Sequence, residues 1–301
     1  MQKSICRKFF VFTITFLFVI SSFASAFNFI LDNRSRPVSG GNWLYVGGNG
    51  PGNYTKIQDA IDNAMDGDTV FVYDDSSPYK EKVIVDKSIK LIGENRNSTI
   101  IESYGKIIFV NAGKVQISDF TIQQYGIRLS SGIFVSSSSS ETIISDNIIK
   151  GLGYGIIILS SNNTIYGNFI INNYEGIVLA SENKFSSSNN TIYRNEIAYS
   201  KSYSIVLELS YSNKIYENNF KRKISMSTHI YWIYDMVYYI KYPLKRNQWY
   251  NNYWDKPRLG PKLIPGELIW PLTKFMYLMC PWYQFDWHPA KQPYEVSLIA
   301  I

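Results

Sequence analysis

The stretch NNTIYGNFIINNYEGIVL, residues 162–179, is followed by a near-copy, NNTIYRNEI, at residues 189–197. Both consist of short runs of β-branched and aromatic residues separated by Asn and Gly, a pattern typical of short strands joined by tight turns. Related segments, IISDNII and KIYENNF, begin at residues 143 and 214. A repeat of about 22 residues built from short strands predicts a parallel β-helix, in which each coil stacks on the previous one.

Asparagine recurs at one position of this repeat. The residues are Asn147, Asn168, Asn195 and Asn218, which lie 21, 27 and 23 residues apart. Because stacked coils bring equal positions side by side, these side chains are expected to form a hydrogen-bonded amide ladder at an inward-facing turn. A ligand site is the alternative interpretation. Two further positions are always apolar and predict inward columns: Ile144, Ile165, Ile192 and Ile215, and Ile149, Ile170, Ile197 and Phe220.

The ends of the β-helix have to be covered, since each would otherwise expose an unpaired strand edge. Near the N-terminus, Thr55 and Gln58 have the spacing of a capping box. An apolar stripe with helical spacing predicts a short amphipathic helix over the first coil: Ile57, Ala60, Ile61, Ala64 and Met65. At the other end, residues 256–301 contain many Pro and Trp and predict an irregular C-terminal cap.

Two segments, GNYTKIQDAIDNAMDGDTVFVY at residues 52–73 and YKEKVIVDKSIKLIGENRNSTII at residues 79–101, resemble the opening of right-handed parallel β-helix proteins. Pectinesterases and the NosD-type periplasmic copper-binding family begin in this way. The Asn-bearing coils and NNYWD at residues 251–255 look more like the NosD-type family. The resemblance covers roughly residues 45–255 and implies an all-β fold, a right-handed parallel β-helix. It indicates the fold more than the activity, because this scaffold carries many functions.

The first 26 residues have the pattern of a secretion signal: basic MQKSICRK, apolar FFVFTITFLFVISSF and the small-residue cleavage site ASA. A membrane anchor is the alternative, although the apolar run is short for a spanning helix. We therefore expect a signal peptide at 1–26, a lead-in at 27–44, a β-helix at 45–255 with an insert at 221–246, and a cap or tail at 256–301. The mature protein is expected to be secreted, at the cell surface or periplasmic, with no membrane span.

Removal of the signal would lower the formal net charge from +6 to +3, which is too little to indicate a nucleic-acid partner. It would also remove Cys6 and leave Cys280 as the single cysteine, so no intramolecular disulfide is expected. The sequence does not indicate an oligomeric state.

Two aromatic surfaces are candidates for binding carbohydrate or a surface polymer. One is an outward column of tyrosines: Tyr166, Tyr193, Tyr216 and Tyr250. Aromatic rings can contact sugar rings and their hydroxyls add hydrogen bonds, although a ladder that only stiffens the sheet is the alternative. The other is the basic, aromatic insert, with Tyr231, Trp232 and Tyr234. This insert could instead fold back onto the β-helix or pair as a hairpin.

No known catalytic motif of a pectinesterase, polygalacturonase or pectate lyase is present, because the acids of the central coils are scattered. No catalytic residue and no cofactor are therefore expected. A group of soft ligands suited to Cu(I) lies near the C-terminus: Met276, Met279, Cys280 and His288. These are weak candidates, since Met and Cys also fill irregular gaps in apolar packing. Five sequons are candidate glycosylation sites: Asn33, Asn53, Asn97, Asn162 and Asn189.

The sequence thus favours an exported, non-catalytic β-helix surface protein that binds carbohydrate or a cell-surface polymer. One alternative is a polysaccharide-active lyase, hydrolase or esterase with an unrecognised site. The other, implied by the resemblance, is NosD-like copper handling.

Overall fold

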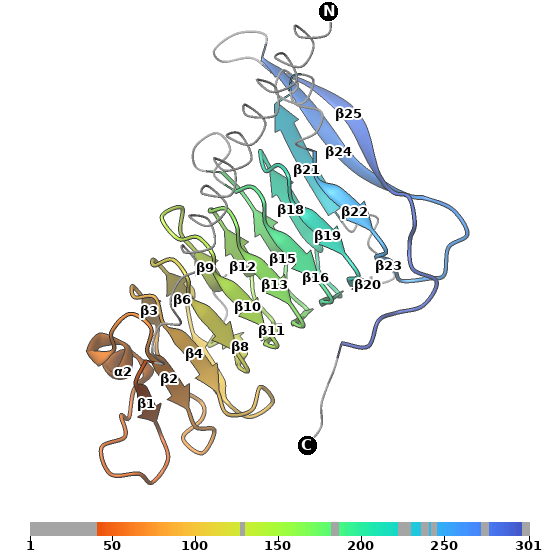
Figure 1. Ribbon diagram of the computed structural model, residues 1–301. Coiled ribbons are helices and arrows are strands. Elements are labelled where there is room, and N and C mark those ends of the chain that lie inside the picture. Colours follow the sequence, from red (N-terminus) through yellow and green to blue (C-terminus); the bar gives the residue numbers. More distant parts are fainter. Residues whose placement is uncertain are drawn as a thin grey trace, which may run out of the picture. The chain divides into compact units, whose positions relative to one another are not determined.

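The computed structural model describes residues 41–126, 130–181, 187–221, 230–235, 241, 246–271 and 277–296 (Figure 1). The predicted signal peptide and residues 27–40 of the lead-in lie outside the described residues. The described part is a parallel β-helix of three sheets, with one α-helix, α2 (Ile57–Asn63). No helix in this part is long and apolar enough to cross a membrane.

Sheet 1 has the strand order β1-β2-β4-β7-β10-β13-β16-β19-β22. Its strands are β1 (Trp43–Val46), β2 (Thr69–Val72), β4 (Lys90–Gly93), β7 (Gln116–Ser118), β10 (Ile143–Ser145), β13 (Thr164–Tyr166), β16 (Thr191–Tyr193), β19 (Lys214–Tyr216) and β22 (Gln248–Tyr250). Neighbouring strands are parallel, and Ile165 lies beside Ile144 on one side and Ile192 on the other. Equal repeat positions therefore form columns along the β-helix, spaced at the usual strand separation of about 4.8 Å.

Sheet 2 has the order β23-β20-β17-β14-β11-β8-β5 and is also parallel. Its strands are β5 (Ile100–Ser103), β8 (Thr121–Gln124), β11 (Ile148–Lys150), β14 (Phe169–Ile171), β17 (Glu196–Ala198), β20 (Asn219–Lys221) and β23 (Tyr253–Trp254). Each strand follows a sheet 1 strand after only two residues in the central coils, as between Tyr166 and Phe169. This short connection is the turn that carries the asparagine column.

Sheet 3 has the order β25-β24-β21-β18-β15-β12-β9-β6-β3. Its strands are β3 (Val83–Val85), β6 (Lys106–Val110), β9 (Ser131–Val135), β12 (Tyr154–Ile158), β15 (Glu175–Leu179), β18 (Ile205–Glu208), β21 (Ile230–Asp235), β24 (Lys262–Pro271) and β25 (Tyr277–Asp286). All pairs are parallel except β24 with β25, which form an antiparallel hairpin.

The core fills the space between the three sheets. Both predicted inward columns are confirmed, since all eight of their side chains have an exposed fraction of 0 %. Sheet 3 adds a third buried column with Ile133, Ile156, Ile177 and Ile205. Burying an Ile side chain contributes about 1.5–3 kcal/mol, so each added coil stabilises the stack.

Helix α2 covers the first coils as predicted, with Ile57, Ala60 and Ile61 buried. The predicted capping box is wrong, because no side chain of the helix's own start caps it. The cap is instead Glu81, whose carboxylate oxygens accept hydrogen bonds from the Ile57 and Gln58 backbone N–H groups at 2.9 and 3.0 Å. Met65 lies beyond the end of the helix and is 72 % exposed, so it does not extend the apolar stripe.

Residues 230–235 of the predicted insert form a regular strand. β21 pairs in parallel with β18 on one side and with β24 on the other. This part of the segment therefore continues sheet 3 and does not interrupt it. Residues 222–229, 236–240 and 242–245 of the predicted insert lie outside the described residues.

The C-terminal cap is more regular than the sequence predicts. β24 and β25 are strands of 10 residues each, and Pro265 and Pro281 lie within their pairing. Strand β25 closes the last coil with its side chains: the Trp249 indole N–H donates to Gln284 Oε1 at 2.6 Å. The Trp254 indole N–H donates to Asp286 Oδ2 at 3.1 Å. Because these tryptophans are buried, the hairpin keeps the end of the core away from water.

Candidate functional site

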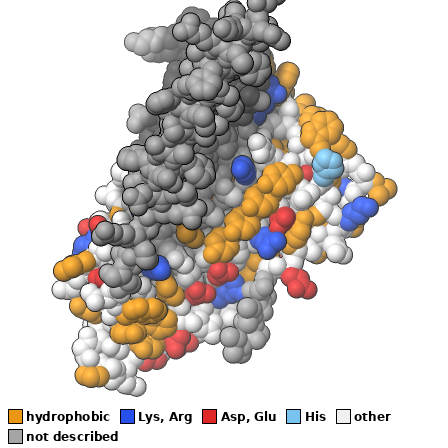
Figure 2. All heavy atoms as spheres, viewed as in Figure 1, with side chains coloured by type: hydrophobic (Ala, Val, Ile, Leu, Met, Phe, Trp, Pro, Cys, Tyr) orange, Lys and Arg blue, Asp and Glu red, His pale blue; other side chains and the backbone are white. Residues whose placement is uncertain are grey.

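Four tyrosines stack in one outward column of sheet 1, which we call the tyrosine ladder: Tyr166, Tyr193, Tyr216 and Tyr250. Successive ring centroids lie 5.2, 5.2 and 4.8 Å apart, with interplanar angles of 18°, 6° and 4°. All four side chains are half-buried. Figure 2 shows a continuous ridge of hydrophobic side chains with charged groups beside it. The ladder is thus an ordered apolar ridge with a phenol hydroxyl at every coil.

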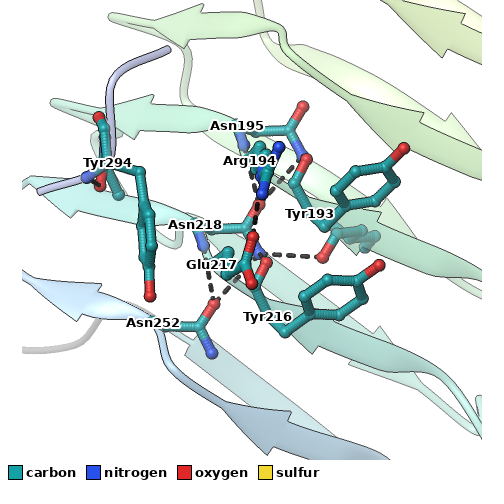
Figure 3. Close-up of polar contacts among 10 residues, drawn as sticks. Tyr193, Arg194, Asn195, Tyr216, Glu217, Asn218, Asn252 and Tyr294 are labelled. Carbon is teal, nitrogen blue, oxygen red and sulfur yellow. Dashed lines mark hydrogen bonds and ion pairs between the residues drawn. The ribbon is translucent and has the colours of Figure 1, made fainter. Parts of the chain in front are cut away.

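The stacking decides which surfaces of these rings a ligand can reach. Tyr193 and Tyr216 each have a neighbouring ring on both sides, so their faces are covered. Figure 3 shows these two rings parallel and directed away from the asparagine column. Ser145 precedes Tyr166 in the column, so no ring of this column stacks on the outer face of Tyr166. A polymer along the ladder therefore meets ring edges and hydroxyls.

Three of the ladder hydroxyls, those of Tyr193, Tyr216 and Tyr250, are favoured in their neutral form. Burial is the main cause that raises the pKa of Tyr193, Tyr216 and Tyr250 above the ordinary value. The nearby tyrosines raise the pKa of Tyr193 and Tyr216 further, and the Glu217 carboxylate raises that of Tyr216 and Tyr250. A neutral phenol both donates and accepts hydrogen bonds, which suits an uncharged polyhydroxyl ligand.

A charged pair, Arg194 and Glu217, lies beside the ladder. Each of the two residues directly follows a ladder tyrosine, at the turn between sheet 1 and sheet 2. The backbone φ angles of Gly167, Arg194 and Glu217 are 67°, 51° and 54°, in the left-handed region. Arg194 Nε donates to Glu217 Oε2 at 2.8 Å, and this hydrogen bond is the main cause that raises the pKa of Arg194. Because the Arg194 side chain is 62 % exposed, the pair adds little stability and remains accessible to a ligand.

The asparagine ladder predicted from the sequence is present (Figure 3). The side-chain N–H of Asn147 donates to Asn168 Oδ1 at 3.1 Å, and that of Asn168 donates to Asn195 Oδ1 at 3.0 Å. The ladder continues through Asn218 and Asn252 at 3.0 and 3.1 Å. Each of these amides also donates to backbone carbonyls. Because its donors are bound within the protein and it is buried, this column is structural and not a ligand site.

A second buried asparagine ladder lies five residues before Asn168, Asn195, Asn218 and Asn252. Asn163 donates to Asn190 Oδ1 at 2.9 Å, and Asn213 donates to Asn247 Oδ1 at 3.0 Å. The Asn190 backbone N–H donates to Asn213 Oδ1 at 2.8 Å, which joins the two pairs. The sequence carries a signal for this column in the first residue of NTIY at 163 and 190, NKIY at 213 and NQWY at 247.

Two carboxylates share one turn position in consecutive coils. Asp119 and Asp146 have φ angles of 66° and 58°. Burial is the main cause that raises the pKa of Asp119, and the Asp146 carboxylate raises this pKa further. A hydrogen bond with Ser118 and the charge of Arg96 lower the pKa. The next coil places Gly167 at this position, so the acidic column ends after two residues.

The candidate copper ligands that the structure describes do not converge. Met279 and Cys280 lie on β25, and Met276 lies outside the described residues. Cys280 lies six residues before the strand end at Asp286, which corresponds to roughly 20 Å at about 3.4 Å per strand residue. His288 follows beyond that end and is exposed. Among the described residues, no group of three or more His, Cys, Asp or Glu is arranged to hold a metal ion.

The other predicted site residues are placed less fully. The backbones of Tyr231, Trp232 and Tyr234 form part of β21, but their side chains lie outside the part of the chain that the structure describes. Among the candidate glycosylation sites, Asn97, Asn162 and Asn189 are exposed, Asn53 is half-buried, and Asn33 lies outside the described residues. The Asn53 amide donates to the Gly47 carbonyl at 2.6 Å, so its side chain is occupied in the folded protein.

Comparison with known proteins identifies one family. The family described as "Periplasmic copper-binding protein (NosD)" matches residues 61–259. The Dettilon tailspike protein (gp208) is a similar solved structure, with 12% identity and a TM-score of 0.36 over 70% of this chain and 51% of that chain. The enzymatically active domain of Bacteriophage CBA120 tailspike protein 2 has 12% identity and a TM-score of 0.35, over 62% of this chain and 37% of that chain. The present chain thus spans about half or less of each tailspike structure. No curated protein matches the sequence.

Proposed function

We propose that this chain, which belongs to the NosD family over residues 61–259, is an exported, non-catalytic β-helix protein that binds a carbohydrate polymer on the outer face of sheet 1. The observation that carries this proposal is the tyrosine ladder. Its regular apolar ridge extends over four coils, and each coil adds one phenol hydroxyl. A repeating ligand that matches this spacing gains one contact per coil.

The covered ring faces define the type of contact. A sugar chain lies across the ring edges, where the hydroxyls donate to or accept from sugar hydroxyls. The Arg194–Glu217 pair, half-exposed beside the ridge, supplies a charged donor and a charged acceptor in a fixed geometry. Several weak contacts of this kind add up along a polymer, since binding at one coil brings the next unit to the neighbouring coil.

The NosD family description also raises copper as a cargo for this chain. The described residues do not fit that role, because the Met279–Cys280 segment and His288 are separated by most of a ten-residue strand. A copper titration therefore belongs to the test: stoichiometric binding that is lost in Cys280→Ser and His288→Ala would favour metal handling over the carbohydrate proposal.

The proposal is tested with a glycan array on the wild type and on the variants Tyr193→Ala and Tyr216→Ala. We expect each variant to bind its polymer roughly tenfold more weakly, as for a central aromatic contact. Tyr174→Ala is the matched control, because Tyr174 is 48 % exposed but lies outside the ladder. Absence of binding to every polymer, or equal loss in the control, would overturn the proposal. Reducing-end or unsaturated products from uronate polymers would contradict its non-catalytic part.

A further inference from the structure

A second surface with glycan-binding chemistry lies at the N-terminal end of the β-helix, away from the tyrosine ladder. There a cavity of about 640 Å³ opens between the loop after β1 and the loop after β2. It is lined by Tyr45, Gly48, Asn49, Gly50, Pro51, Asn53, Tyr73, Asp74, Asp75 and Glu94, which we call the N-terminal pocket. Its volume falls in the range of small-ligand sites, roughly 300–1,000 Å³.

The glycine-rich loop that forms one wall is held in place by hydrogen bonds. The Gly48 N–H donates to Asp75 Oδ1 at 3.0 Å, and the Gly47 N–H donates to the Tyr54 carbonyl at 2.8 Å. Gly48 has φ +70°, and a Cβ there would come within 2.8 Å of the Tyr73 ring. The loop can therefore lie against this ring only because residue 48 is glycine. Because this wall is already ordered, ligand binding there costs little conformational entropy.

The aromatic wall differs from the tyrosine ladder in its exposure. Tyr45 is 38 % exposed and stacks on Tyr73 with a centroid distance of 6.0 Å and an interplanar angle of 25°. It belongs to β1, the terminal strand of sheet 1, and it also stacks on Trp43 of the same strand, with a centroid distance of 6.2 Å and an interplanar angle of 27°. Aromatic surface is thus available at the mouth of the pocket, beside carboxylates.

The polar wall is acidic. Glu94 Oε2 accepts from the Asp74 N–H at 3.0 Å, and Asp74 Oδ2 accepts from the Ser98 hydroxyl. With Asp75, three carboxylates line the pocket, and the lining contains no Lys or Arg. Ionised carboxylates only accept hydrogen bonds, so they match the hydroxyl donors of a sugar. Their negative potential opposes uronate, sulfate or phosphate groups.

We propose that the N-terminal pocket binds a neutral hexose unit of a glycan. The sugar ring contacts the Tyr45 and Tyr73 rings, and its hydroxyls donate to Asp75 and Glu94. This inference rests on the proposed function, because both ligands are glycans. It adds a second glycan contact, with its own selectivity, at the β1 end of sheet 1. A metal-binding role does not compete, since no described cluster of acids is arranged as a metal site.

The test is calorimetric titration of the full chain with a neutral gluco- or manno-hexasaccharide and with a hexagalacturonate. We expect the neutral oligosaccharides to bind and the uronate to bind at least tenfold more weakly. Tyr45→Ala and Glu94→Gln should each weaken neutral binding by roughly tenfold. Glu94→Gln keeps the size of the side chain, so it tests the charge even if Tyr45→Ala disturbs β1; thermal unfolding of each variant checks the fold.

The ladder variant Tyr193→Ala separates this inference from the proposed function. The control variant Tyr174→Ala, outside both surfaces, leaves hexasaccharide binding unchanged, and in the Tyr193→Ala background Tyr45→Ala and Glu94→Gln still weaken hexasaccharide binding by roughly tenfold. Equal hexasaccharide affinity in the wild type, Tyr45→Ala and Glu94→Gln would overturn the pocket and leave the ladder proposal standing. Tighter binding of the hexagalacturonate than of the neutral oligosaccharides would also overturn it.

Discussion

At the scale of single residues, the asparagine columns show why one residue type recurs in this chain. An amide side chain carries two donors and one acceptor oxygen, so it can satisfy the coil on each side at once. Asn195 Oδ1 accepts from both the backbone N–H and the side chain of Asn168. Its own amide donates to Asn218, to the Tyr193 carbonyl and to the Ile165 carbonyl. Neither Asp, which lacks donors, nor an apolar residue can replace it without leaving buried groups unpaired.

Replacing Asn195 by Ala should therefore lower the free energy of unfolding by about 3 kcal/mol, because buried donors and acceptors lose their partners. Urea unfolding followed by circular dichroism measures the change. Asn97→Ala is the control, since Asn97 is exposed, and a change within about 0.5 kcal/mol is expected there. Equal unfolding midpoints for the two variants would mean that the ladder contributes nothing to stability.

At the scale of secondary-structure elements, helix α2 shows how a short element depends on distant side chains. It has 7 residues, too few for an isolated helix to be stable in water. Its buried residues attach it to the first coils, and Glu81 holds its N-terminus from the loop that leads into β3. The Lys87 ammonium also donates to the Ile61 carbonyl at the other end of the helix, at 2.7 Å. Both ends are thus capped by the coil against which the helix packs.

Glu81→Ala should lower the free energy of unfolding by about 1 kcal/mol, because two N–H groups at the start of the helix lose their acceptor. Thr55→Ala tests the capping box that the sequence predicts and should change it very little. Thermal or urea unfolding of the two variants gives the comparison directly. A larger effect of Thr55→Ala than of Glu81→Ala would show that the helix begins as the sequence pattern suggests.

At the scale of the whole β-helix, the stack of coils ends in the β24–β25 hairpin. Asp286 is fully buried and ends the asparagine ladder by accepting from the Asn252 backbone N–H at 3.0 Å and from its side chain at 3.1 Å. The same carboxylate accepts from the Trp254 indole N–H and from the His288 backbone N–H. An acceptor-only group suits the last rung, where no further coil needs a donor. At this end of the β-helix, Asp286 therefore binds both the last amide of the asparagine ladder and the buried Trp254 indole.

Asp286→Ala should lower the free energy of unfolding by about 3–5 kcal/mol, since several buried donors lose their acceptor together. Limited proteolysis should cut the hairpin region of this variant sooner than in the wild type. Glu295→Ala, an exposed acid in the same C-terminal segment, is the control and should behave as the wild type. Intact resistance to proteolysis in Asp286→Ala would show that the hairpin is held without this carboxylate.

The sequence by itself determined the repeated part of the molecule: the β-helix, its inward columns, the asparagine ladder and the existence of an outward tyrosine column. These follow from position in the repeat, because stacking converts equal spacing along the chain into neighbours in space. The orientation of the tyrosine rings did not follow, since it depends on how each ring packs on the next. The strand at residues 230–235 did not follow from the sequence for a related reason. Its position depends on pairing with β18 and β24, and the spacing of the repeats does not predict it.

Only the tertiary structure decided the ends, where the repeat stops. The Glu81 cap joins residues 23 and 24 positions apart, and the Asp286 closure joins residues 32 and 34 positions apart. The N-terminal pocket brings together residues as far apart as Tyr45 and Glu94, 49 positions along the chain. Such contacts carry no periodic signal, because each occurs once and is set by the loops that cross the end of the stack. The unrepeated ends are therefore where the folded chain gains the features, a pocket and a closing hairpin, that its repeats do not predict.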